Sequence, residues 1–345
     1  MFEPNFTYTD AIVNRLVKIT SARDAVVNAY MVPKWEVSLR RDALLRSAHA
    51  STSIEGNPLS LEEVSELAKG REVMATRRAK QEVLNYLEVL EGIEDYLVEG
   101  AIAEETVLRL HADVSKEVLD DAHNEGRYRK VRVYVGNSVT GEVIFMPPPP
   151  SSVKGLMADL IEWLTSDAAL SMNPVLVAGI AHYEFVRIHP FVDGNGRTAR
   201  ALATLVLVMR EFDIKRFFAL DDYYDSDQPS YYRALNEVDQ DTLDLTWWLD
   251  YFTQGVLVAI SEVKTKVLKL SIDRKRVNRK GQVALTRRQM EIVQHVIDNG
   301  MITTKEVAQR YKITIQAALK ELKKLVEREV LSMQGKGRAT HFVLA

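Results

Sequence analysis

Apolar residues recur mainly at spacings of three and four from about residue 10 to residue 272, which is the spacing of one face of an α-helix. The main exception lies between residues 131 and 147, where apolar positions alternate on both sides of a Gly136-Asn137-Ser138 turn and then stop at four prolines. Alternation around such a turn predicts a β-hairpin, and proline ends it because it cannot donate to a strand ladder. The pattern therefore predicts a mainly α fold with one hairpin.

The pattern changes after residue 272. Residues 273–284 predict a basic linker, and beyond it three helical runs precede an alternating pair of strands: Thr286 to Asn299, a run that starts at Thr303, Thr314 to Arg328, and Val330 to Leu344. Residues 274–345 contain 16 Lys and Arg against 6 Asp and Glu, whereas the rest of the chain contains 29 against 42. The order resembles a winged helix-turn-helix domain over residues 285–345, which reads DNA in many proteins and docks protein partners in others, so both kinds of partner stay open.

A short segment between two apolar runs, Val175 to Ile188 and Ala201 to Met209, has the composition of a phosphate site. It reads His189-Pro-Phe-Val-Asp-Gly-Asn-Gly-Arg-Thr-Ala-Arg200. Its glycines predict a turn that opens a new helix, where backbone N–H groups and the helix dipole attract an anion. Arg197 and Arg200 then share one helix face and present planar cationic forks that suit phosphate oxygens.

Two further groups in this segment complete the predicted chemistry. Asp193 would repel a bare phosphate, and a divalent ion between them removes this conflict, so we expect Mg²⁺ to be held by Asp193. His189 precedes a proline, which favours an extended or turn conformation after the helix. An imidazole titrates near pH ~6.5, so His189 is a candidate general base for a hydroxyl nucleophile.

The same twelve residues resemble the Fic family signature, HPFx[D/E]GNGRxxR, at every specified position. Fic proteins usually transfer AMP from ATP to a Ser, Thr or Tyr hydroxyl of a protein. The resemblance implies that His189 deprotonates the hydroxyl and that Asp193 holds Mg²⁺. It further implies that Gly194, Asn195 and Gly196 grip the α- and β-phosphates, with Arg197 assisting and Arg200 reaching the γ-phosphate.

The hairpin also resembles a family element, the flap. Taken alone, the alternation fits a surface excursion equally well. In the family, the flap edge takes the main chain of the target by strand addition and aligns its hydroxyl. The resemblance places target docking at Val143, Ile144, Phe145 and Met146.

Residues beyond the signature resemble the element that contacts adenosine in the family. They are Tyr231, Tyr232 and Asn236, although paired tyrosines are most often packing residues. His182 lies seven residues before His189 on the apolar run, and we expect it to be a buried, hydrogen-bonded structural residue rather than a metal ligand.

An upstream segment, Ser51-Thr-Ser-Ile-Glu55-Gly56-Asn57-Pro58, ends a helical pattern that begins near residue 37. Glu55 would lie at the negative end of this helix, which disfavours a carboxylate. The segment resembles the inhibitory motif of the family, (S/T)xxxE(G/N), in which the Glu pairs with the second arginine of the signature. The resemblance implies an inhibitory pair of Glu55 with Arg200, assisted by Ser51. The same Glu could instead position a water for removal of AMP, and the sequence does not rank the two directions.

The composition is that of an ordinary globular protein: 345 residues, 46% apolar and 27% charged. The chain contains no cysteine, which excludes disulfides and thiol catalysis. No apolar run reaches the ~18 residues of a membrane span, and the first residues lack the basic start of a secretory signal. We therefore expect a cytoplasmic protein without a membrane partner.

These observations give one prediction for the whole chain. It comprises an N-terminal helical region at 1–100 with an inhibitory helix at about 37–57, a Fic catalytic core at 101–272 with a flap at about 131–147, the linker and the winged helix. The predicted activity is ATP- and Mg²⁺-dependent AMP transfer to a protein, restrained by Glu55. The alternatives are a DNA-binding regulator that uses the nucleotide pocket as a sensor, an enzyme that removes AMP, or a transferase of phosphate, UMP or phosphocholine. The sequence also leaves open a homodimer.

Overall fold

The computed structural model describes residues 2–29, 31, 33–136, 143–213, 215–271, 285–328, 330–335, 337 and 340–344. The chain divides into two compact units. The first unit comprises Met1–Asp24 and Ala43–Val263, and the second comprises Ala25–Asp42 and Lys264–Ala345. None of the helices in the described part of the chain has both the length and the apolar character needed to cross a bilayer.

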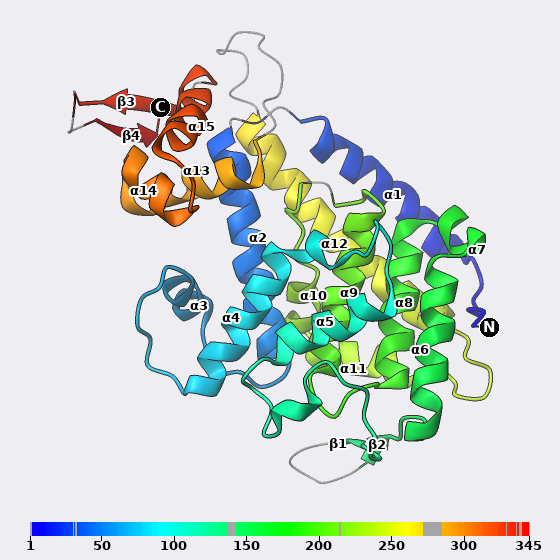
Figure 1. Ribbon diagram of the computed structural model, residues 1–345. Coiled ribbons are helices and arrows are strands. Elements are labelled where there is room, and N and C mark those ends of the chain that lie inside the picture. Colours follow the sequence, from blue (N-terminus) through cyan, green and yellow to red (C-terminus); the bar gives the residue numbers. More distant parts are fainter. Residues whose placement is uncertain are drawn as a thin grey trace. The chain divides into compact units, whose positions relative to one another are not determined.

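The first unit is helical apart from one small hairpin, which confirms the predicted fold class (Figure 1). Three of its helices, α1, α2 and α12, have residues in both units. The elements in chain order are α1 (Asp10–Val27), α2 (Pro33–Ser53), α3 (Leu61–Ala68), α4 (Arg77–Glu91), η1 (Ile93–Tyr96), α5 (Glu104–Ser115), η2 (Ala122–Asn124), β1 (Val135–Gly136), β2 (Val143–Phe145), α6 (Pro150–Leu164), α7 (Asp167–Ser171), α8 (Pro174–Ile188), α9 (Asn195–Met209), α10 (Asp221–Ser226), α11 (Gln228–Asn236) and α12 (Thr246–Ser271).

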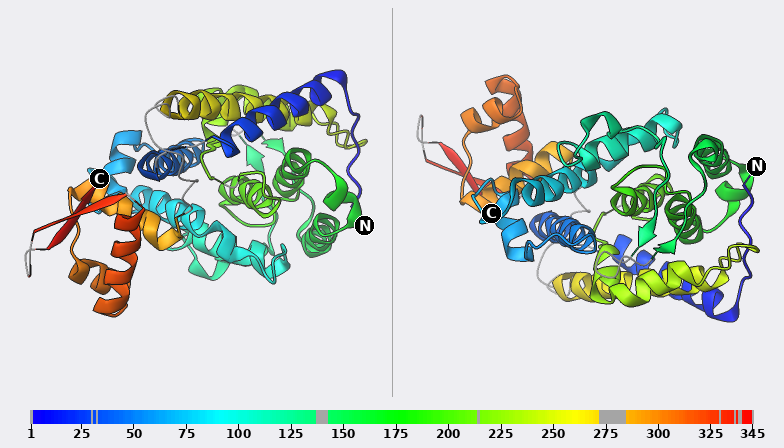
Figure 2. Two further views of the ribbon diagram at one scale, coloured as in Figure 1. Left: turned by 90° about the horizontal axis from the view of Figure 1, so that it is seen from above. Right: turned by 90° about the horizontal axis from the view of Figure 1, so that it is seen from below.

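Helices α8 and α9 form the centre of the first unit. All but two of the residues from Val175 to Ile188 are buried, which explains why this run is apolar on every face. Its start combines Pro174 at the first helical position with Asn173, whose side chain accepts a hydrogen bond from the N–H of Val175. Helix α9 packs against α8 and α5, and α6 packs against α8. The green helices of this group are seen nearly end-on in Figure 2.

Helix α12 approaches α8 closely at a glycine. The indole N–H of Trp248 donates to the carbonyl of Gly179 over 2.7 Å. A Cβ at Gly179 would lie 2.9 Å from side-chain atoms of both Leu249 and Phe252. The absence of a side chain at this position therefore lets the two helices meet.

The hairpin predicted near the middle of the chain is present, but its strands are short. β1 pairs antiparallel with β2, with Val135 opposite Phe145 and Gly136 opposite Val143. Residues 131–134 were expected in the first strand and are not in it. The carbonyl of Val131 accepts from the guanidinium of Arg129 over 3.2 Å. Most of the predicted turn lies in 137–142, outside the described residues.

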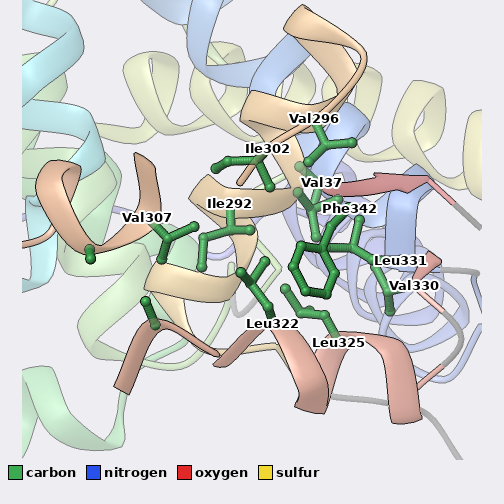
Figure 3. Packing of buried hydrophobic residues seen from close by; sticks show 13 residues of the cluster. Val37, Ile292, Val296, Ile302, Val307, Leu322, Leu325, Val330, Leu331 and Phe342 are labelled. Carbon is green, nitrogen blue, oxygen red and sulfur yellow. The ribbon is translucent and has the colours of Figure 1, made fainter. Parts of the chain in front are cut away.

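The second unit has its own core. Helices α13 (Arg287–Asn299), α14 (Thr304–Arg310) and α15 (Ile315–Glu327) precede an antiparallel pair of strands, β3 (Leu331–Gln334) and β4 (His341–Leu344). Figure 3 shows Val37, from the first turns of α2, pointing into the same apolar cluster as Phe342 and Leu325. The element order agrees with that expected beyond residue 285, while the winged-helix class and DNA binding stay predictions. The linker predicted at 273–284 lies outside the described residues.

Candidate functional site

The segment from 189 to 200 links α8 to α9 through a tight turn. Helix α8 ends where His189 adopts the left-handed conformation, with φ 50° and ψ 61°. Helix α9 begins after Gly194, which is also left-handed at φ 76°. Between them, the amide of Asn195 closes the turn by accepting from the N–H of Phe191 and donating to its carbonyl, both over 2.9 Å. The Asn195 side chain therefore shapes the turn rather than facing a ligand.

His189 is half-buried, and one nitrogen of its ring is already engaged. Its Nδ1 lies 3.2 Å from the carbonyl oxygen of Val186, which can only accept, so Nδ1 carries the proton in the neutral ring. Nε2 then keeps its lone pair. Burial lowers the pKa of His189, and the nearby guanidinium of Arg129 lowers it further, whereas the Val186 carbonyl acts in the opposite direction. The imidazole is thus neutral at physiological pH and able to take a proton.

The start of α9 has the properties of an anion site. No side chain caps its first turn by a hydrogen bond, so its N–H groups and the positive end of its dipole remain for an anion. Arg197 is 2% exposed, and its Nε and Nη1 have no hydrogen-bond partner in the part of the chain that the structure describes. Its nearest carboxylates, those of Glu82 and Asp193, lie at 3.7 and 3.8 Å, beyond hydrogen-bond distance. Buried donors of this kind are costly unless a ligand satisfies them.

Arg200 is buried and joined to the end of α2. Its Nη2 donates to the Oε1 of Glu55 over 2.7 Å and to the backbone carbonyl of Ser51 over 2.8 Å, while its Nε donates to the hydroxyl of Ser51 over 2.7 Å. The Oδ1 of Asp221 lies 3.6 Å from the Nε of Arg200. Burial alone would lower the pKa of Arg200, but Glu55, the buried Tyr231 and Tyr86, and Asp221 raise it well above the ordinary value, so Arg200 stays charged.

Glu55 also lies against the glycine turn. A Cβ built on Gly196 would overlap the Oε1 of Glu55 and would lie 3.2 Å from Arg200. A carboxylate therefore occupies the space beside the first turn of α9, in the same place where the sequence predicts phosphate. The structure brings Glu55 and Arg200 together across 145 positions of sequence.

Asp193 precedes the turn and is about half exposed. Its Oδ1 accepts from the N–H of Gly194 over 2.6 Å, and its Oδ2 lies 3.5 Å from Arg78. No cluster of three or more His, Cys, Asp or Glu side chains suited to a metal ion occurs in the described ranges. Magnesium commonly binds through one or two carboxylates and substrate phosphates, so an exposed single carboxylate beside an anion site fits this ion.

The hairpin presents the side chains predicted for docking of a target. Val143, Ile144 and Met146 are each at least half exposed, and Phe145 is partly buried. Val143 and Phe145 occupy strand positions paired with β1. Exposed apolar side chains on a two-stranded ribbon are suited to contact with a peptide strand.

The three residues predicted near adenosine have different environments. Tyr231 is 1% exposed, stacks on Tyr224 and shares a hydrogen bond of 2.9 Å with His182. It is therefore part of the core and not free to stack on a base. Tyr232 is 40% exposed, and its hydroxyl donates to the carbonyl of Ile54, next to Glu55, over 3.3 Å. Asn236 is exposed at the end of α11.

Two buried residues at the site were not found from the sequence. Arg129 contacts the carbonyl of His189, and His111 stacks on Phe191 with ring centroids 3.6 Å apart. The Nδ1 of His111 accepts from the N–H of Gly126 and its Nε2 donates to the carbonyl of Asp193, each over 2.9 Å. Burial lowers the pKa of His111 to about 4, so it is a neutral bridge. Bonds to backbone carbonyls leave no sequence signature, so no signal would have found these residues.

Comparison with known proteins gives a consistent result. Residues 101–207 match the model of the Fic/DOC family. The chain is 30% identical over 252 residues to the protein adenylyltransferase Fic of Drosophila virilis, covering 68% of this chain and 49% of the relative. For the protein of the same name from Drosophila grimshawi the identity is 33% over 203 residues, 56% of this chain and 39% of the relative. The chain thus spans about half or less of the length of these curated relatives.

Solved structures show the same likeness. A Fic family protein from Desulfovibrio desulfuricans superimposes with a TM-score of 0.66 at 26% identity, covering 100% of this chain and 98% of the other. Fic-1 from C. elegans superimposes with a TM-score of 0.58 at 25% identity, covering 73% of this chain and 71% of that structure. The similarity to the Desulfovibrio desulfuricans protein therefore includes residues of both units.

Proposed function

Because residues 101–207 of this chain form a Fic domain, we propose that the protein is an adenylyltransferase that moves AMP from ATP to a Ser, Thr or Tyr hydroxyl of a protein. One observation carries the proposal. A neutral imidazole with a free Nε2 lies in the same twelve residues as an uncapped helix start and a buried arginine with unused donors. A base and a polyphosphate site in one segment are the groups that this transfer requires.

The proposed reaction forms a bond between the hydroxyl oxygen and the α-phosphorus of ATP. The bond from this phosphorus to the oxygen that bridges the α- and β-phosphates breaks, and pyrophosphate leaves. The proton of the hydroxyl passes to the Nε2 of His189. Most of the rate acceleration comes from positioning and from neutralising charge, because phosphoryl-type transfer needs little covalent help from the protein.

The phosphates are proposed to bind at the turn before α9. Backbone N–H groups at Asn195 and Gly196 would hold the α- and β-phosphates, and that of Gly194 would join them after leaving the Oδ1 of Asp193. The unpartnered donors of Arg197 would add to this site. Asp193 would hold Mg²⁺, which when bound neutralises charge on the phosphate oxygens. Tyr232 and Asn236, both exposed, are the proposed contacts on the adenosine side.

The acceptor is proposed to bind along the hairpin. The exposed side chains of Val143, Ile144 and Met146 support docking of an extended peptide. Main-chain pairing at this ribbon would bring the hydroxyl to His189 without strong dependence on the acceptor's side chains. This arrangement suits a transferase of proteins rather than of small molecules.

Glu55 is proposed to restrain the enzyme. Its carboxylate lies beside Gly196 and is bonded to Arg200, so it competes with the γ-phosphate for that arginine. A triphosphate bound productively must separate the two side chains. ATP binding and the ion pair are therefore alternatives, and the pair lowers the fraction of competent molecules.

Labelled ATP tests the proposed activity. We expect the Glu55→Gly variant incubated with ATP and Mg²⁺ to label protein from the α-phosphate and not from the γ-phosphate. The matched variant Glu55→Gly/His189→Ala should bind ATP but lose at least ~100-fold in labelling, because it lacks the base. Label from the γ position alone would identify a kinase, and no label from either would favour a nucleotide sensor.

A further inference from the structure

Arg129 lies between the flap and the end of α8 and is only 3% exposed. Its hydrogen-bond partners in the described ranges are all backbone carbonyls. Its Nε donates to His189 over 2.7 Å, and its Nη2 donates to Pro148 over 2.6 Å and to Ile188 over 3.3 Å. Its Nη1 donates to Val131 over 3.2 Å, and its own backbone N–H donates to Pro190 over 2.9 Å.

The environment of this guanidinium is unusual for a buried charge. Within the described part of the chain, none of its partners is a carboxylate, and burial lowers the pKa of Arg129. The charge is instead compensated by the last carbonyls of α8, where the helix dipole is negative. Burying a cation is costly unless hydrogen bonds compensate it, and here backbone carbonyls supply these bonds.

The bonds connect three segments that are separated in the sequence. Val131 precedes β1, and Pro148 follows β2, so the two form the legs of the flap. Ile188, His189 and Pro190 form the end of α8 and the entry to the glycine turn. One planar side chain therefore fixes both legs of the flap to the backbone of His189.

We propose that Arg129 is the positioning residue of the site: it holds His189 in its left-handed conformation and keeps the flap at a fixed distance from the His189 imidazole. This inference rests on the proposed transfer of AMP to a target docked on the flap. Arg129 itself would contact neither ATP nor the acceptor. Its contribution is to the alignment of the acceptor hydroxyl with Nε2.

The backbone of His189 needs such support. The backbone of a residue other than glycine is strained in the left-handed region, and this strain persists only where neighbouring contacts hold the residue in place. The carbonyl of His189 is turned towards Nε of Arg129, and the carbonyl on each side of it also bonds to Arg129. Loss of the two bonds from the guanidinium, to the carbonyls of Ile188 and His189, would release the peptide and move the ring that depends on it.

Arg129 also affects the charge of the ring. The charged groups that face His189 are Arg129, which lowers its pKa, and Glu55 and Asp193, which raise it. Burial lowers the pKa as well, and the carbonyl bonded to Nδ1 raises it. Replacing Arg129 by a neutral residue therefore raises the pKa of His189, so the base becomes protonated at higher pH.

The experiment compares Arg129→Gln, Arg129→Lys and Arg127→Gln, each in the Glu55→Gly background. Arg127 is the matched control, because it lies two residues away and its side chain is exposed. Transfer from α-labelled ATP is followed against pH, and ATP affinity is measured by calorimetry. For Arg129→Gln we expect a rate on the order of 100-fold below the control, with ATP affinity within about threefold and the acid limb moved to higher pH.

Arg129→Lys separates geometry from charge. It keeps the cation but loses the planar fork, so we expect a lower rate with an unmoved acid limb. It also carries the test if Arg129→Gln does not fold. A rate and a pH profile for both Arg129 variants equal to those of Arg127→Gln would overturn the proposal.

A second readout keeps this inference separate from the proposed function. Absence of label in the control itself would contradict AMP transfer, and the Arg129 inference would then be tested on the protein without nucleotide. We expect faster amide hydrogen exchange in Arg129→Gln at 131–136 and 143–146, and a raised pKa of the His189 ring by NMR titration. Unchanged exchange and an unchanged ring pKa would show that Arg129 positions neither element.

Discussion

His189 combines a strained backbone with a defined ring. Its left-handed conformation ends α8, and the Val186 carbonyl at Nδ1 leaves Nε2 as the free nitrogen. A general base needs a fixed tautomer and a pKa near or below the working pH. Both conditions follow from the residues around the ring, since burial and Arg129 lower its pKa.

His182 is the other histidine of α8 and has a different role. It is fully buried among aromatic rings, and its Nε2 shares a hydrogen bond with Tyr231. Its Nδ1 has no hydrogen-bond partner among the described residues. The expectation of a structural, hydrogen-bonded histidine agrees with this environment.

The burial of His182 predicts a pH dependence of stability. Burial lowers its pKa from 6.5 to about 3, so below pH 6.5 the unfolded chain takes up a proton that the folded chain does not. The folded state therefore loses stability as pH falls from about 6.5 towards 3, by about 2 kcal/mol at pH 5. Urea unfolding at pH 8 and pH 5 should show that His182→Gln lacks this component. Equal losses in wild type and variant would rule it out.

At the scale of elements, two helical glycines, Gly179 and Gly155, differ in the space around them. Gly179 lies where α8 meets α12, and a Cβ there would crowd Leu249 and Phe252. Gly155 in α6 has nothing within 4 Å of a built Cβ. The two positions therefore form a matched pair in which only one glycine is required by packing.

This pair gives a second stability prediction. Gly179→Ala should destabilise the protein by about 1–3 kcal/mol, because the methyl group overfills the contact between the helices. Gly155→Ala should stabilise it by about 0.5–1 kcal/mol, because alanine favours a helix more than glycine does. Denaturant unfolding followed by circular dichroism measures both. Shifts of the same sign would contradict the assigned packing at Gly179.

The elements differ in how well they could be predicted from the sequence. The helical pattern and the glycine turn are local signals, so the mainly α fold and the boundary between α8 and α9 could be predicted from neighbouring residues. The strands of the hairpin were predicted too long: alternation of apolar residues begins at Val131, but the first strand begins at Val135. Tyr231 was a candidate for adenine contact, but its burial depends on Tyr224 and His182, which no local pattern reveals.

At the scale of the molecule, the contact between Glu55 and Arg200 joins distant parts of the sequence. The structure shows the geometry of this contact. From the sequence, it could be predicted only because the segment 51–56 resembles a motif of the family. Arg129 and His111 had no such motif and became visible only through their bonds to backbone groups. Candidate chemistry in one contiguous segment can thus be predicted from the sequence. The contacts that support this segment come from distant residues and can be identified only in the folded structure.

We propose that the ion pair of Glu55 with Arg200 limits how many molecules can bind ATP productively. If the pair favours the restrained state by roughly 2–3 kcal/mol, its removal raises the competent fraction about 30–150-fold. A substitution at Glu55 replaces none of the groups proposed to carry the reaction, which are His189, Arg197 and the glycine turn. The gain should therefore appear as a faster reaction of the same kind.

The most direct measurement is the initial rate at which purified wild type and Glu55→Gly incorporate label from α-labelled ATP into protein. We predict a rate for Glu55→Gly that is higher by about 30–150-fold. A rate for Glu55→Gly equal to or below that of wild type would contradict the account.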